Sequence, residues 1–154
     1  MQVGNLTIPI FEKNQMGQVT ATITVTNHID QILAARGFIP EGEVRSITLQ
    51  NVLVDTGATL LSFPTSLIEQ LGLPVKGDTE VKTANGPVPS RIFCDASLEI
   101  NGRHSTFDCL ELTTLDIPLL GVLPMETLGL EPDLQKNELR MLPMTGDDSY
   151  IYVV

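Results

Sequence analysis

The dipeptide Asn101-Gly102 constrains the fold of this chain more than any other feature, because it predicts a tight β-hairpin. Asn-Gly readily adopts the positive φ angles of a two-residue type I′ turn, and such a turn fixes the register of both flanking strands. The flanking segments, 91–100 and 103–112, alternate between apolar and polar residues over most of their length. We therefore expect a two-stranded unit with one face in the core and one face in solvent.

The register of this hairpin predicts where its polar and sulfur-containing side chains lie. Cys94 falls opposite Cys109 on the buried face, where the Cα atoms of a hydrogen-bonded pair are about 5.5 Å apart. A disulfide is geometrically possible at that distance, but we expect two buried, reduced thiols. His104 falls opposite Glu99 on the other face, and we interpret these residues as a solvated cross-strand pair rather than as part of a catalytic base.

Further strands and short helices are expected on both sides of the hairpin. Apolar residues alternate with threonines from 19 to 26, which is the period of a half-buried strand. A helix over 64–71 would hold Pro64 in its first turn and end at Gly72, and a helix over 122–128 would end at Gly129. The other expected elements are a helix at 30–36, strands at 44–54, 79–83, 88–92, 139–142 and 150–154, and a turn at 84–87.

The composition excludes several classes of function. Nine Lys and Arg residues against nineteen Asp and Glu residues give a net charge of −10, which repels phosphate backbones and anionic lipid. The two histidines and two cysteines lack the spacing of a zinc site, and no glycine motif for a dinucleotide or a nucleoside triphosphate is present. Carboxylates and hydroxyls remain as catalytic groups, so we expect no cofactor, no metal and no nucleic-acid or membrane partner.

One motif carries the chemistry. The apolar run 52–54 stops at Asp55-Thr56-Gly57, and later in the chain Leu119-Leu120-Gly121 precedes a predicted helix. This combination, over residues 44–142, resembles the retropepsin-like aspartic proteases, in particular their single-domain bacterial and cyanobacterial members. The resemblance implies a mainly β fold, a closed acid-protease barrel with two or three short helices and one Asp-Thr-Gly per chain.

The resemblance also implies the organisation of the chain, and the sequence itself indicates a location. A single protease domain would cover residues 19–154, preceded by an N-terminal strand or arm over 1–18. No targeting segment or run of about 18 apolar residues is recognisable, so we expect a cytoplasmic protein. A secreted protein remains an alternative if a leader has been removed.

Roles for individual residues follow from the resemblance. In this family two aspartates share a proton and activate the water that attacks a peptide carbonyl. Asp55 would be the catalytic carboxylate, with Thr56 and Gly57 completing the catalytic loop, and a homodimer would supply the second Asp55. The substrate-binding residues that the resemblance implies are Ala58, Thr59, Ala84, Asn85 and Gly86. The last three would form the tip of a flap that closes over an extended peptide; the alternative is a plain hairpin turn without that role, which turn chemistry alone would explain.

Two positions depart from the retroviral pattern. Thr59 and Val122 stand where retroviral members have an Asp and an Arg that pair with each other, and this pair cannot form here. The sequence thus predicts an aspartic endopeptidase that acts on peptides as a homodimer. The alternative is a dimeric peptide-binding or scaffolding module that has the same fold without efficient turnover.

Overall fold

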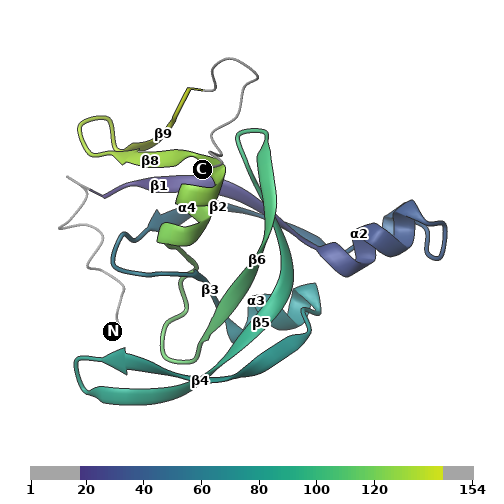
Figure 1. The fold of residues 1–154 in the computed structure, drawn as a ribbon, viewed down its shortest axis with the longest axis horizontal. Helices are drawn as coiled ribbons and strands as arrows, with labels where there is room; N and C mark the ends of the chain where they lie inside the picture. Colours follow the sequence, from purple (N-terminus) through teal and green to yellow (C-terminus); the bar gives the residue numbers. More distant parts are fainter. Residues whose placement is uncertain (1–17, 144–154) are drawn as a thin grey trace, which may run out of the picture.

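The computed structural model describes residues 18–143 and shows a mainly β fold with three short α-helices (Figure 1). Of the N-terminal arm expected over 1–18, only residue 18 is among the described residues. The strand expected at 150–154 lies outside them. The strands are β1 (Thr20–Asn27), β2 (Ser46–Val54), β3 (Leu61–Pro64), β4 (Val75–Thr83), β5 (Gly86–Ile100), β6 (Arg103–Leu112), β7 (Leu119–Leu120), β8 (Leu130–Asp133) and β9 (Glu138–Met141). The helices are α2 (His28–Ala35), α3 (Thr65–Leu71), α4 (Val122–Leu128) and the short 3-10 helix η1 (Glu41–Glu43).

Seven strands form one sheet in the order β1-β2-β7-β3-β6-β5-β4. Strand β1 also pairs with β5, so the pairings run in a circuit through six strands and leave β4 outside it. The core contains apolar side chains from the six strands of this circuit, including Ile23, Phe63 and Leu98, together with side chains from α3, α4 and β8. Strands β4 and β5 continue beyond the sheet as a two-stranded ribbon, at the lower edge of Figure 1. Strands β8 and β9 form a separate ribbon.

The central hairpin confirms the predicted register near its turn and corrects it farther away. Glu99 pairs with His104, as expected, and Asn101 has the positive φ of the predicted turn. At Asp95, whose φ is +64°, β5 contains a bulge, and beyond it Phe93 rather than Cys94 lies opposite Cys109. The predicted Cys94–Cys109 pairing is therefore wrong, because the bulge adds a residue to one strand.

The bulge also separates the environments of the two cysteines. Cys109 is fully buried, whereas Cys94 is only half-buried, so the prediction that both lie in the core holds for Cys109 alone. Both thiols are free, as expected. Burial raises the pKa of each thiol.

Two short segments differ from the sequence-based expectation because of long-range pairing. Pro64 is the last residue of β3 and occupies the N-cap position of α3, one residue before the first helical turn in which it was expected. Strand β3 was not predicted, and it forms because its four buried residues pair in parallel with β6. Strand β8 was also not predicted and pairs with β9, which confirms the expected strand near 139–142.

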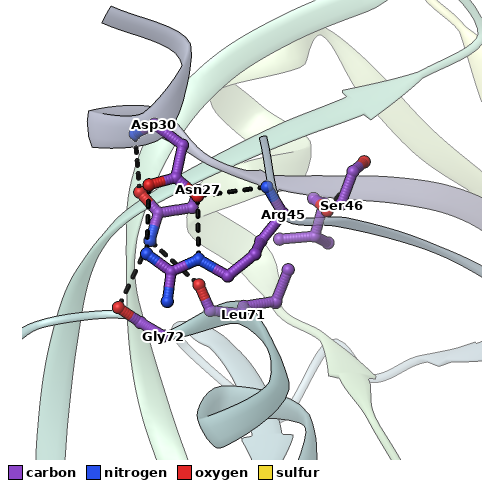
Figure 2. A network of polar contacts seen from close by, with 7 residues as sticks. Asn27, Asp30, Arg45, Ser46, Leu71 and Gly72 are labelled. Carbon is purple, nitrogen blue, oxygen red and sulfur yellow. Dashed lines mark hydrogen bonds and ion pairs between the residues drawn. The ribbon is translucent and has the colours of Figure 1, made fainter. Parts of the chain in front are cut away.

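A polar network attaches α2 to the rest of the molecule (Figure 2). The buried Asn27 accepts a hydrogen bond from the Asp30 amide, which starts α2 at His28, two residues earlier than expected. Its side-chain nitrogen donates to the Leu71 carbonyl at 2.9 Å. The Arg45 guanidinium pairs with Asp30 at 2.8 Å and holds the pKa of that carboxyl below its usual value. Thus the buried Asn27 side chain joins the start of α2 to the end of α3.

The helices α3 and α4 end as predicted. Each stops at a glycine in the left-handed conformation, Gly72 with φ +63° and Gly129 with φ +65°. No helix within residues 18–143 is long and apolar enough to span a membrane.

Candidate functional site

Asp55 lies directly after β2, in a loop that β7 supports. Strands β2 and β7 pair in parallel, with Val54 opposite Leu120. The Asp55 amide continues this pairing by donating to the Leu120 carbonyl at 2.9 Å. The Asp55 carboxylate Oδ1 accepts a hydrogen bond from the Gly57 amide at 2.8 Å. The carboxylate is therefore oriented by the backbone of its own loop.

Gly121 lets the chain pass against this loop at very short range. The amides that follow it bind the loop, with Val122 donating to the Ala58 carbonyl and Leu123 donating to the Thr59 carbonyl, both at 2.9 Å. A Cβ atom on Gly121 would lie 2.8 Å from the Ala58 oxygen and even closer to another backbone oxygen of the loop. Only glycine allows this approach, so the backbone at Gly121 packs directly against the Asp55 loop.

A cavity of about 430 Å³ opens beside Asp55. It is bounded by the Asp55 loop, the ribbon strand β4, and parts of β5, β6 and β7. Its apolar lining includes Leu60, Val81, Ile92, Leu110, Leu112 and Leu119. Asp55 and Glu80 are the carboxylate residues that line it within the described part of the chain. An apolar pocket with a carboxylate at one side suits the side chain of a peptide residue next to a polar reaction centre.

The structure brings some of the predicted site residues together. Asp55, Gly57, Ala58 and Thr59 all line the cavity, whereas Thr56 is exposed and does not. Thr59 also accepts a hydrogen bond through its backbone carbonyl, as described above.

The predicted flap residues lie elsewhere. Ala84 and Asn85 form the turn at the tip of the β4–β5 ribbon, and Gly86 begins β5, so the expected turn at 84–87 is shorter than predicted. The turn is fixed by the Thr83 hydroxyl, which donates to the Gly86 carbonyl at 2.6 Å and accepts from the Asn85 amide at 3.2 Å. None of the three residues lines the cavity, which the ribbon reaches through Thr79, Glu80 and Val81.

Sequence reasoning missed a buried carboxylate close to this cavity. Glu111 is only 4% exposed and lies in β6 between two lining residues, Leu110 and Leu112. Glu111 is two residues from the buried Cys109 and so lies on the same, core-facing side of the strand. An acidic residue at such a position is the sequence feature that could have revealed it. Buried carboxylates are normally paired, and Arg91 provides the partner at 2.8 Å.

Other nucleophiles and metal ligands are not assembled around Asp55. Within residues 18–143 no group of three or more His, Cys, Asp or Glu side chains could hold a metal ion. His28 and His104 lie in a different, polar hollow of about 570 Å³ together with Glu99. The described chain also shows no second carboxylate hydrogen-bonded to Asp55.

Comparison with known proteins is consistent with this geometry. A family model described as aspartyl protease matches residues 40–131, a segment that contains both Asp55 and Gly121. EIAV protease, in a structure with the inhibitor HBY-793, matches with a TM-score of 0.52 and 18% sequence identity, over 75% of this chain and 92% of the viral one. That likeness shows a shared fold. Among the curated proteins none matches the chain.

Proposed function

This chain belongs to the aspartyl protease family, and on that premise we propose that it is an endopeptidase that works as a homodimer. Asp55 of each subunit forms the catalytic pair, and the circuit of strand pairings in each subunit corresponds to the acid-protease barrel. The observation that carries the proposal is the Asp55 loop, which Gly121 supports at the edge of an apolar cavity, and whose carboxylate is bonded to no other carboxylate within residues 18–143.

The mechanism requires two carboxylates in different protonation states. Two like charges about 3 Å apart do not ionise together easily, so the pair retains one proton. The ionised Asp55 takes a proton from water as the water oxygen bonds to the peptide carbonyl carbon, and the protonated Asp55 donates to the carbonyl oxygen. The C–N bond then breaks as the Asp55 that took the proton from water donates it to the leaving amine, while the other Asp55 takes a proton back from a hydroxyl of the tetrahedral intermediate. A single Asp55 cannot supply both functions.

The remaining predicted residues have supporting roles in this proposal. Thr56 is exposed, which leaves it free to contact the partner subunit, while Ala58 and Thr59 face the substrate at the cavity wall. Ala84, Asn85 and Gly86 lie at the end of the ribbon and reach the peptide by movement of that ribbon. The substrate is a peptide or an unstructured protein segment, because the cavity is open and lies beside an extended strand, β4.

Cleavage of casein between pH 3 and pH 7, measured together with sedimentation, tests the proposal. Wild-type protein should cleave casein as a dimer, and Asp55→Asn should keep the fold and the dimer while losing at least about 99% of the activity, as expected for loss of a catalytic base. The matched control is Asp116→Asn, which changes an exposed carboxyl in the loop between β6 and β7 and should leave cleavage intact.

Two results would contradict the proposal. Full activity at concentrations where the protein sediments as a monomer would show that one Asp55 is sufficient. A stable dimer that binds casein but leaves it intact at every pH would favour the peptide-binding or scaffolding alternative.

A further inference from the structure

Glu111 lies at the point where the β4–β5 ribbon leaves the sheet. The pairing between β5 and β6 begins at Ile92 and Leu110 and continues toward the central turn. On the other side of Ile92, residues 86–91 of β5 pair only with β4. Beyond this branch point the ribbon makes no strand pairing with β6, so its attachment to the rest of the sheet depends on side-chain contacts.

Four hydrogen bonds to Glu111 provide this attachment. Arg91 donates to both carboxylate oxygens, from Nε at 2.8 Å and from Nη2 at 2.9 Å. The Thr65 hydroxyl at the start of α3 donates to Oε2 at 2.7 Å. The buried Ser90 hydroxyl donates to the Glu111 backbone carbonyl at 2.6 Å. One buried glutamate thus joins the first free residues of the ribbon to both β6 and α3.

The two hydrogen bonds between Arg91 and Glu111 fix the orientation of the Arg91 side chain relative to β6. Its guanidinium forms a fork with the Glu111 carboxylate, and the same group lies 5.1 Å from the centre of the Phe93 ring. A bidentate arginine–carboxylate pair fixes orientation as well as distance. Phe93 itself is buried at the base of the ribbon. The pair therefore constrains the angle at which β5 departs, and not merely its position.

The network lies directly behind the wall of the cavity. Side chains alternate between the two faces of a strand, so Glu111 points away from the cavity while its neighbours Leu110 and Leu112 point into it. In the same way Ile92 lines the cavity and Arg91 does not. A change at Glu111 would alter the cavity through the wall residues and through Thr79 and Val81 of the ribbon, without touching the peptide.

We propose that Glu111 is a positioning residue that sets the pose of the β4–β5 ribbon over the cavity beside Asp55. This inference rests on the proposed function for its effect on peptide binding, but its effect on the ribbon is independent of catalysis. Because the ribbon contributes to binding and Asp55 carries the chemistry, Glu111 affects KM for the peptide much more than kcat.

The test compares two buried carboxylates that are paired with arginine in the same way. Asp30 has a side chain that is 7% exposed and bonds Arg45 at 2.8 Å and 3.0 Å, which matches the 4% exposure and the distances at Glu111. The Asp30 pair lies at α2, and neither of its residues lines the cavity. Asp30→Asn therefore controls for the general loss of a buried ion pair, and Glu111→Gln removes the pair at the ribbon.

Two measurements decide the proposal. In amide hydrogen exchange of the whole protein, Glu111→Gln should speed exchange across residues 79–90 through local opening of the ribbon, and Asp30→Asn should speed it much less. In cleavage of fluorescein-labelled casein, Glu111→Gln should raise KM about tenfold, which corresponds to about 1.4 kcal/mol of binding free energy, with kcat within about twofold of wild type. Arg91→Lys, which keeps the charge but loses the fork, should show a smaller shift of the same kind.

Specific results would overturn the inference. Unchanged exchange in the ribbon of folded Glu111→Gln and Arg91→Lys would show that the network does not position it. Equal acceleration in Asp30→Asn would assign the effect to global stability. The exchange result stands even if wild-type protein does not cleave casein, so failure of this inference and failure of the proposed function are distinguishable. If Glu111→Gln does not fold, Arg91→Lys and its exchange pattern decide the matter.

Discussion

Replacing Gly121 by alanine should destabilise the protein and distort the Asp55 loop. The added Cβ would lie 2.8 Å from the Ala58 carbonyl oxygen and closer still to the Leu60 carbonyl oxygen. Both atoms belong to the backbone, so no side-chain rotation can relieve the contact. The loop must move away from the segment that carries Gly121.

The expected cost has two parts. Overpacking at a close contact costs about 1–3 kcal/mol. Displacing the loop also weakens the hydrogen bonds that Val122 and Leu123 donate to it, each of which contributes about 0.5–1.5 kcal/mol. The free energy of unfolding should therefore fall by about 2–6 kcal/mol, a large share of the roughly 5–15 kcal/mol typical of a domain.

Urea denaturation followed by circular dichroism measures this loss, with Gly42→Ala as the matched control. Gly42 has an ordinary φ and open space around its Cα, so alanine there should change the free energy of unfolding by less than about 0.5 kcal/mol. Casein cleavage by any folded Gly121→Ala protein should also fall, since the Asp55 loop is displaced. If Gly121→Ala is as stable as Gly42→Ala, with an unchanged m-value, the proposed support of the loop by this glycine is wrong.

Three further predictions concern the fold. Asp30→Asn should lower the free energy of unfolding at pH 7 by about 1–3 kcal/mol, because Arg45 loses a charged partner. Arg45 lowers the pKa of Asp30, so this stabilisation is fully present above the pKa of an unfolded Asp, near 3.9, and is lost as the pH falls through the lower pKa of the folded protein. Urea titrations should therefore show the stabilities of wild type and Asp30→Asn beginning to converge below about pH 4. With a thiol reagent, Cys94 should react in the native protein and Cys109 only after unfolding, as peptide mapping can show. Gly102→Ala, at φ +86° with open space around it, should cost about 1–2 kcal/mol from backbone strain alone, and equal stability to wild type would contradict the turn assignment.

The sequence by itself determined the features that depend on neighbouring residues. Asn101-Gly102 placed the central turn because its positive φ angles are a local property. The alternation over 19–26 identified β1, and Gly72 and Gly129 located the ends of two helices. The Asp-Thr-Gly motif at Asp55 indicated the candidate catalytic loop for the same reason, since motif and loop are contiguous.

The tertiary structure alone decided the features that join distant segments. The bulge at Asp95 shifts the register of the β5–β6 pair, so Cys94 leaves the core, and no local pattern specifies that shift. Strand β3 exists because β6 offers it a parallel partner. The family resemblance implied that Leu119-Leu120-Gly121 lies beside the Asp55 loop, whereas the parallel pairing of β2 with β7 and the backbone contacts of Gly121 come from the tertiary structure.

The same distinction separates the two acidic residues on which the proposals depend. Asp55 is recognisable from the residues beside it, whereas Glu111 acquires its role only when Thr65, Ser90 and Arg91 are brought around it from α3 and β5. Burial of a carboxylate is unfavourable unless such partners are in place, and their positions depend on the packing of the whole sheet. The sequence therefore identified the candidate catalytic residue, and only the tertiary structure shows how the ribbon above it is held.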